Sequence, residues 1–209
     1  MKAIVLLFPL LAFVNQLAAK SEAWPVYAFQ NGVHFKSAEE RVKVLKELGY
    51  DGIGSARVRD ALPLPQRLKL YDEAGLKLFS FYVGGRLGPK GHSYGKEIIQ
   101  AIKELNGRDT ILELFVQGNK KSNTDGQAVA FVREIADQAK ESGLRIVLYP
   151  HAGFYVDTLG DAVRVARKCE CDNVGVMFNL CHYLKVEPKT DLKAALTEAK
   201  PLLWQVSTN

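Results

Sequence analysis

The chain has 209 residues, of which 47% are hydrophobic and 24% are charged, so it has enough apolar side chains to bury a full core. This composition excludes a disordered or low-complexity protein. The net charge of +5 comes from Lys and Arg residues that are mixed with Glu along helical segments. Without a basic cluster, a nucleic-acid-binding surface is not expected.

The first 23 residues have the layout of a secretory signal peptide. A positive start at Lys2 is followed by the apolar run Ala3–Val14 and by small residues up to Ala23. The apolar run is about a dozen residues long, shorter than the roughly 20 that cross a bilayer, so no membrane span is expected. We therefore expect an exported protein with one domain at residues 24–209; the alternative is a buried first strand that follows a lysine by chance.

From residue 24 onward, apolar runs of strand length alternate with amphipathic runs of helix length. The predicted strands are Val26–Gln30, Gly52–Ser55, Lys77–Val83, Thr110–Gln117, Arg145–Tyr149, Val174–Phe178 and Leu202–Ser207. The predicted helices are Ala38–Leu48, Pro65–Ala74, Tyr94–Leu105, Asp125–Ser142, Leu159–Lys168 and Leu192–Ala199. Strict alternation is typical of a parallel sheet whose strands are joined by helical crossovers.

Local signals support several helix boundaries. Ser37 followed by Glu40 predicts a capping box, and Thr158 with Asp161 is a weaker version of the same motif. The phrases KELGYDGI, DEAGLKLF and KESGLRIV each join a helix to a strand through a glycine. These glycines fall where a left-handed residue ends a helix, at Gly49, Gly75 and Gly143.

Seven strands and six helices in order, with no second domain, predict an α/β fold of the (β/α)8 TIM-barrel type. An open doubly wound sheet is the alternative, but no Gly-x-Gly-x-x-Gly loop follows the first strand. An eighth strand is not visible before Asn209, and the chain is shorter than the roughly 250 residues of a typical barrel. We therefore expect an incomplete barrel, or else an open sheet with two unpaired edges.

Two stretches end a buried strand with a histidine: LRIVLYPHAGF carries His151 and VGVMFNLCH carries His182. Active sites of such barrels lie at the carboxyl ends of the strands, so we expect both histidines at one rim. An unperturbed imidazole titrates near about 6.5 and serves as a general acid or base at neutral pH. The alternative for each histidine taken alone is a hydrogen-bonded loop residue.

Other polar residues at the predicted strand ends are candidates for binding a substrate. They are His34, Arg57, Tyr82, Gln117, Tyr149, Asn179 and Ser207. Their amide, hydroxyl and guanidinium groups suit sugar hydroxyls, and aromatic rings offer apolar faces. Arg86 and Lys90 either hold an anionic group or are solvated loop residues. Glu113 lies in the middle of a strand, where a structural role is expected.

An odd number of cysteines, three, predicts at least one free or intermolecular thiol in an exported protein. Cys169 and Cys171 precede the predicted strand Val174–Phe178, and Cys181 follows it. A strand of this size is about 20 Å long, so the three thiols and His182 are not expected to share a metal ion.

The sequence resembles the xylose isomerase-like TIM barrels, a family of sugar phosphate isomerases and epimerases. The resemblance covers residues 24–209 and rests on ERVKVLKELGYDGIG, ESGLRIVLYPHAGF and DNVGVMFNLCHYLKV, the last two most similar to exported bacterial members. It implies a (β/α)8 barrel in which a divalent ion (Mg, Mn or Zn) polarises two substrate oxygens. Carboxylates of such members move a proton at the adjacent carbon.

This sequence departs from the family at the metal positions. By the resemblance, the family's fifth-strand glutamate falls on Tyr149, its sixth-strand aspartate on Asn179, and its seventh-strand histidine on or near Ser207. The histidine that touches substrate is kept as His182. Uncharged ligands do not offset the desolvation of Mg²⁺ or Mn²⁺, so no metal site is expected from these residues.

The resemblance and the strand-end residues together indicate an exported sugar isomerase or epimerase, with His151 and His182 as the general acid and base. Its partner is expected to be a small-molecule carbohydrate. The alternative is a non-catalytic carbohydrate-binding barrel that has lost the metal site. An abasic-site endonuclease shares the fold, but it requires a cluster of histidine and carboxylate zinc ligands that this sequence lacks.

Overall fold

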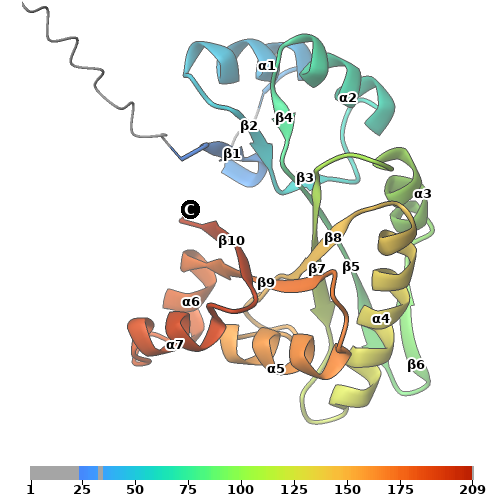
Figure 1. Cartoon of the computed structure of the whole chain (residues 1–209), viewed down its shortest axis with the longest axis vertical. Coiled ribbons are helices and arrows are strands. Elements are labelled where there is room, and N and C mark those ends of the chain that lie inside the picture. Colours follow the sequence, from blue (N-terminus) through green and yellow to red (C-terminus); the bar gives the residue numbers. More distant parts are fainter. Residues whose placement is uncertain (1–23, 33–34, 209) are drawn as a thin grey trace, which may run out of the picture.

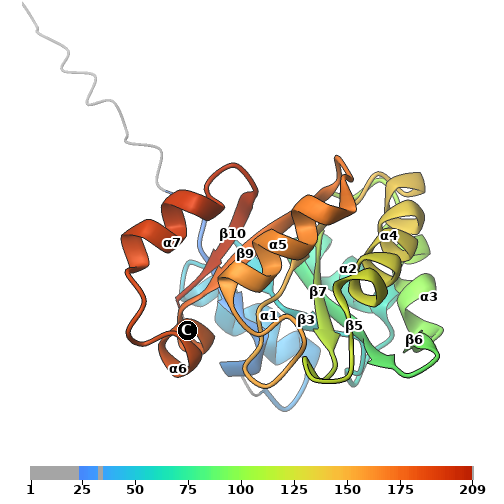
Figure 2. The same ribbon diagram turned by 90° about the horizontal axis from the view of Figure 1, so that it is seen from below.

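The structure is a computed structural model, and it describes residues 24–32 and 35–208. The expected signal peptide (residues 1–23) and His34 lie outside the described residues. In the described part, curved strands form an inner layer and helices lie along its outside (Figure 1). Figure 2 shows helix α5 lying across strand β9, against which it packs.

The strands and helices follow the predicted order closely. The strands are β1 (Tyr27–Phe29), β2 (Gly52–Gly54), β3 (Ala56–Arg57), β4 (Lys77–Leu78), β5 (Ser80–Gly88), β6 (Gly91–Tyr94), β7 (Ile111–Gln117), β8 (Arg145–Leu148), β9 (Val174–Asn179) and β10 (Leu203–Ser207). The helices are α1 (Ala38–Glu47), α2 (Leu64–Glu73), α3 (Glu97–Glu104), α4 (Asp125–Glu141), α5 (Leu159–Cys169), α6 (Leu180–Val186) and α7 (Leu192–Ala199), with a 3-10 turn η1 at Gln30–Gly32.

The order of the strands is that of a barrel. β1 pairs with β2 and β2 with β4, while β3, β5, β7, β8, β9 and β10 pair in that order, all in parallel. β2 covers most of the predicted strand Gly52–Ser55, and β3 follows it directly after Ser55 (φ 51), beyond the predicted end. The predicted strand Lys77–Val83 is divided at Phe79 into β4 and β5. A doubly wound sheet would reverse its order part of the way along. The fold is therefore of the (β/α) barrel type.

The barrel is open between its first and last described strands. β1 and β10 lie on either side of the opening (Figure 1). A cavity of about 940 Å³ lies between them, lined by Tyr27 and Phe29 on one side and Trp204 and Gln205 on the other. The described residues thus form a parallel half-barrel, as the incomplete-barrel prediction requires.

The two faces of the sheet belong to two separate hydrophobic cores. On β7, Leu112 and Leu114 belong to the larger core, which the helices cover. Ile111 belongs to the smaller core inside the barrel, and Phe115 packs against it. Side chains alternate between the two faces of a strand, so Glu113 also points into the barrel.

The structure differs from the predicted elements after β5. This strand continues to Gly88 and turns back as β6, with Gly88 opposite Gly91 in an antiparallel pair. The helix predicted from Tyr94 therefore begins only at Glu97, because Tyr94 is still part of β6. His92 of β6 bonds to Glu134 on α4 at 2.7 Å, and this contact holds the hairpin against the helix. A second difference is α6, which the sequence pattern did not predict.

Several predicted helix ends are confirmed by their hydrogen bonds and dihedral angles. Ser37 accepts a hydrogen bond from the Glu40 amide at 3.1 Å, but the Glu40 carboxylate accepts from the Lys36 amide, so only half of that capping box forms. Thr158 with Asp161 forms a complete capping box. All three glycines in the repeated helix-to-strand phrase have the expected left-handed conformation, with φ of 76° at Gly49, 64° at Gly75 and 69° at Gly143.

Candidate functional site

The structure brings His151 and His182 together at the carboxyl ends of β8 and β9. Their ring centroids are 4.1 Å apart. Gly153 (φ 82) lets the chain reverse after His151, so that the amide of Phe154 donates to the His151 carbonyl at 3.0 Å. The Phe154 ring then stacks on the His151 imidazole at 4.0 Å. The glycine after the strand is therefore what places an aromatic wall against the first histidine.

The backbone of one residue, Ala152, orients both imidazoles. The Ala152 carbonyl lies 3.0 Å from Nδ1 of His151, and a carbonyl only accepts, so this Nδ1 carries the proton. The Ala152 N–H donates to Nδ1 of His182 at 3.3 Å, so this Nδ1 carries a lone pair. In the neutral rings, Nε2 of His151 is then an acceptor and Nε2 of His182 is a donor. The two histidines are held in opposite tautomers.

His182 is neutral at physiological pH. Burial lowers the pKa of its imidazole from 6.5 to about 4, with smaller contributions from the positive charges of His151 and Lys185. The ring of Tyr149 contacts it edge-on at 5.7 Å. His182 therefore offers a neutral N–H group, and not an imidazolium, to a bound molecule.

Asn179 connects His182 to the next strand. Its side-chain oxygen caps helix α6 by accepting a hydrogen bond from the His182 amide at 3.0 Å. Its Nδ2 donates to the Tyr149 hydroxyl at 3.0 Å and lies 3.4 Å from the Ser207 hydroxyl. Because the oxygen serves the helix cap, the side chain presents its N–H group to the inside of the barrel.

The residues at these strand ends do not fit a divalent metal. Burial raises the pKa of Tyr149, and the negative charge of nearby Glu113 raises it further, so the phenol stays protonated. Asn179 directs a donor toward Tyr149 where a metal would need an acceptor. Across residues 24–32 and 35–208, no three His, Cys, Asp or Glu side chains come together as a possible metal site. Cys169 and Cys181 are both free thiols at opposite ends of β9.

An aromatic layer lies beneath the histidines. Tyr82 is 5.0 Å from Tyr149 and 4.8 Å from Phe115, measured between ring centroids. Burial raises the pKa of the Tyr82 hydroxyl, which therefore remains a neutral donor. Phe115 lies on the same strand face as Glu113, two residues nearer the carboxyl end of β7. The layer therefore forms the floor of the site.

Glu113 is fully buried under this floor and joins distant strands. It accepts hydrogen bonds from Ser80 at 2.6 Å and, at shorter range, from Ser55 and Gln205. Burial raises the pKa of its carboxyl group, and the three bonds oppose that shift. The acid on β7 links the Ser55 bend between β2 and β3 to β5 and β10 inside the barrel, which supports the predicted structural role.

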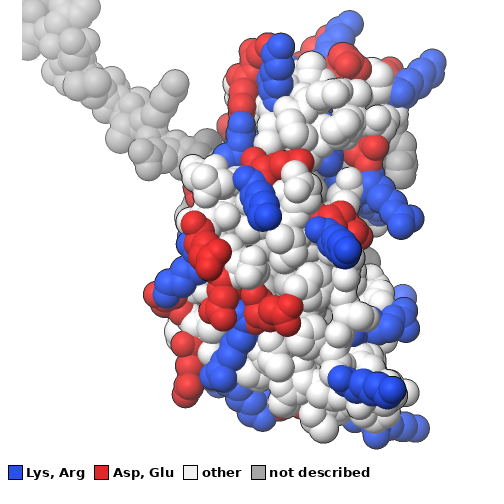
Figure 3. All heavy atoms as spheres, turned by 90° about the vertical axis from the view of Figure 1, so that its right-hand side faces the viewer, with Lys and Arg blue, Asp and Glu red and all other residues white. Residues whose placement is uncertain are grey.

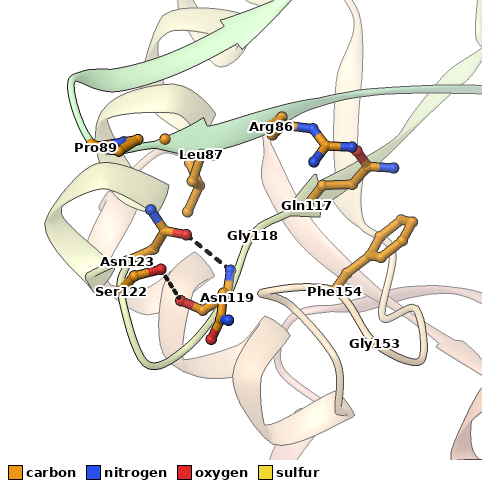
Figure 4. Close-up of a pocket in the computed structure, with 11 residues that line it drawn as sticks. Arg86, Leu87, Pro89, Gln117, Gly118, Asn119, Ser122, Asn123, Gly153 and Phe154 are labelled. Atoms are coloured by element: carbon orange, nitrogen blue, oxygen red, sulfur yellow. Dashed lines mark hydrogen bonds between the residues drawn. The ribbon is translucent and has the colours of Figure 1, made fainter.

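A separate pocket of about 350 Å³ adjoins the histidine pair. It is formed by the ends of β5 and β7, the loop after β7 and the turn after β8 (Figure 4). Arg86 and Gln117 extend toward one another above the ring of Phe154. Phe154 therefore stacks on the His151 ring and also lines this pocket.

The predicted substrate-binding residues fall into three places. One connected group contains the two histidines together with Asn179, Ser207, Tyr149 and Tyr82. Gln117 lines the neighbouring pocket.

Arg57 lies opposite Tyr82 in the strand register, and its exposed guanidinium bonds to Asn31. His34 lies outside the described residues. Two further parts of the site were not predicted, Phe115 and the backbone of Ala152. The sequence could have indicated Phe115, because it lies two residues after Glu113 and therefore on the same strand face. It could not have indicated the Ala152 backbone, because every residue has backbone N–H or C=O groups.

The charge on the face shown in Figure 3 is mixed. Basic and acidic side chains are interspersed there, without a continuous basic stripe. Ion pairs join some of these opposite charges on the protein, among them Lys140 with Asp172 and Lys168 with Asp125. Within the described residues, no helix is long and apolar enough to cross a membrane.

The sequence matches the family described as "Xylose isomerase-like TIM barrel" over residues 42–202. No curated protein sequence matches the chain. Among solved structures, 3-keto-D-glucoside 4-epimerase from E. coli superposes with a TM-score of 0.68 at 18% identity, over 87% of this chain and 77% of that one.

Two other structures have similar scores. D-psicose 3-epimerase with D-tagatose from Clostridium cellulolyticum has a TM-score of 0.64 at 14% identity, over 87% of this chain and 72% of that one. An AP endonuclease of family 2 from Brucella melitensis has a TM-score of 0.66 at 16% identity, over 87% of this chain and 78% of that one. At these identities the likeness establishes the shared fold alone.

Proposed function

Since this chain belongs to the xylose isomerase-like TIM barrel family, we propose that it binds a small carbohydrate at the ends of β8, β9 and β10 and isomerises or epimerises it. The observation that carries the proposal is the histidine pair, in which the backbone carbonyl and N–H of Ala152 set opposite tautomers on His151 and His182. The neighbouring structures that are sugar epimerases support the choice of substrate class.

The proposed reaction is a proton transfer next to a carbonyl. Nε2 of His151 takes the proton from the carbon, and the electrons of the broken C–H bond form a C=C bond. The carbonyl oxygen becomes an oxyanion, to which Nε2–H of His182 donates a hydrogen bond. A neutral imidazole suits this role because it stabilises the charge without being titrated at neutral pH. For an isomerisation, the His151 imidazolium returns the proton to the former carbonyl carbon. The hydroxyl proton on the neighbouring carbon passes to the oxyanion, and a new carbonyl forms at that neighbouring carbon.

We propose that the visible residues replace the family's metal ion with neutral donors. The divalent ion of the family polarises substrate oxygens; here the available groups are the N–H of His182 and the hydroxyl of Tyr149. Tyr82 and Gln117 supply further hydrogen bonds to sugar hydroxyls. The proposal therefore assigns no metal cofactor to Tyr149, Asn179 or Ser207.

A non-catalytic carbohydrate-binding barrel is the second candidate. It is favoured by the contacts of Asn179 with Tyr149 and Ser207. These three residues stand at the family's metal-ligand positions by the resemblance, and here they bond to one another. The aromatic floor and Phe154 would still stack on a sugar in such a protein.

Deuterium exchange tests the proposal. The full chain is incubated in D2O with the keto sugars D-fructose, D-psicose and D-tagatose, and NMR follows deuterium at the carbon next to the carbonyl. We expect exchange by the native chain and its loss in His151→Gln and His182→Gln. His92→Gln is the matched control, since His92 bonds to Glu134 away from the site. Binding of these sugars without exchange in the native chain would favour the non-catalytic candidate.

We also propose that the chain is exported and that its leader is removed. The support is the charge, apolar run and small residues of the first 23 positions. Sequencing the mature protein from its amino terminus should find a start between Lys20 and Trp24. An intact Met1 on the protein in the soluble cell fraction would refute export.

A further inference from the structure

The pocket beside the histidines contains a cation without a counter-ion. Arg86 is the one charged side chain among the described residues that line it. Neither the guanidinium of Arg86 nor the carboxamide of Gln117 has a hydrogen bond or ion pair within residues 24–32 and 35–208. Asp157, an acidic residue of the turn after β8, accepts a hydrogen bond from the Gly153 amide at 2.8 Å and lies 3.9 Å from the ammonium group of Lys120.

The backbone around Arg86 is fixed on both sides. Arg86 lies opposite Gln117 of β7 on one flank and opposite Ser93 of β6 on the other. The base of the arginine side chain is therefore held by two strand partners, although its guanidinium is exposed. Positioned donors lose less entropy when they bind, so this arrangement favours recognition.

The opposite wall of the pocket is also ordered. Within the loop after β7, the Asn119 amide donates to Oδ1 of Asn123 at 2.9 Å, and the Lys121 amide donates to Oδ1 of Asn119 at 2.9 Å. A Cβ on Gly118 would lie 2.9 Å from Oδ1 of Asn123 and 3.2 Å from Cβ of Leu87, closer than ordinary contacts. The glycine therefore allows the loop and β5 to approach each other, which forms the pocket.

We propose that this pocket binds an anionic group, a carboxylate or a phosphate, carried by the carbohydrate that reacts at the histidines. Arg86 would pair with the anion, and Gln117 would donate to it or to a neighbouring hydroxyl. Phe154 lines the pocket and stacks on His151, so the proposed anion site lies one aromatic ring away from the histidine pair. The inference rests on the function proposed above and narrows its substrate class to acidic sugars.

The test compares three probes that differ in charge: D-glucose, D-glucuronate and D-glucose 6-phosphate. Their affinities for the full chain are measured by calorimetry at low and high salt. We expect one or both anionic sugars to bind about tenfold or more tightly than glucose, since charge-assisted hydrogen bonds are the stronger ones. The two anionic arms distinguish a carboxylate from a phosphate. Added salt should reduce the preference.

Arg86→Gln should abolish the preference for the anionic sugars. Lys121→Gln is the matched control, because it removes the same charge from an exposed residue of the adjoining loop that does not line the pocket. Equal affinities for all three probes, binding of none, or an unchanged preference in Arg86→Gln would overturn the inference. Deuterium exchange with D-fructose and with D-fructose 6-phosphate separates the two proposals: exchange without anion preference refutes only the pocket, and anion preference without exchange of either sugar refutes only the reaction.

Discussion

Replacing Glu113 by leucine is expected to lower the free energy of unfolding by about 3 kcal/mol, because three buried donors lose their acceptor. Each unsatisfied buried donor costs about 1–3 kcal/mol of stability. Leucine also removes the cost of burying an acidic group, which offsets part of the loss from the three donors. For a domain of this size, about 3 kcal/mol corresponds to a fall in Tm of about 6–12 °C. Thermal unfolding followed by circular dichroism measures the shift, and Glu141→Leu, at an exposed position on α4, is the control.

Glu113→Gln separates the hydrogen bonds from the charge. The amide keeps a carbonyl acceptor for Ser55 or Gln205, so its stability near pH 5 should lie within about 1 kcal/mol of the native chain. Burial raises the pKa of Glu113 above its ordinary 4.5, so the folded state holds the proton more tightly than the unfolded state. The free energy of unfolding of the native chain therefore decreases as the pH rises from 4.5 through the raised pKa of Glu113.

The glutamine variant does not ionise, so its Tm should decline less than that of the native chain between about pH 5 and about pH 8. Parallel Tm curves for the two proteins would refute the assignment of a raised pKa. A loss of less than about 1 kcal/mol in Glu113→Leu would refute the bracing role of the acid.

Three further outcomes are expected. The His182 imidazole should titrate by NMR with a pKa of about 4, and this pKa should rise in His151→Ala because a neighbouring positive charge is removed; a midpoint of about 6.5 in the native chain would contradict its burial. Since that pKa is lowered, stability should fall as the pH drops from about 6.5 toward about 4, where the unfolded state takes the proton first. Asn179→Asp should replace the N–H donor to Tyr149 by a carboxylate that accepts from its hydroxyl, and the added negative charge should raise the His182 pKa, with the helix cap retained; an unchanged titration would refute the proximity of residue 179 to His182. A chelator should shift Tm by less than about 1 °C, whereas tight stoichiometric Mg²⁺, Mn²⁺ or Zn²⁺ would show that the donor set had been misjudged.

Hydrophobic periodicity was sufficient for most of the fold. β7 and α4 lie within one residue of their predicted boundaries, because both have long apolar patterns and clear end signals. The β5–β6 hairpin was missed because its glycine-rich turn resembles a loop, and because its pairing depends on contact with α4. α6 was missed because it is short and follows β9 without a linker.

The site was predictable to the extent that strand ends share one rim. That rule placed His151 and His182 together without any knowledge of distances. The opposite tautomers were not predictable, since they depend on the backbone of Ala152, whose side chain has no role. The sequence left Arg86 either as an anion-binding residue or as a solvated loop residue. The described residues that line its pocket include no acidic side chain, which favours the first interpretation.

The most direct test of the account is the protonation state of the two histidine rings. Long-range ¹H–¹⁵N NMR of the chain labelled with ¹⁵N-histidine, at neutral pH, identifies which ring nitrogen carries the proton. The structure predicts a proton on Nδ1 of His151 and on Nε2 of His182, giving one lone pair and one N–H group toward the substrate. The same tautomer on both rings, or a positively charged His182, would contradict the proposed base and donor.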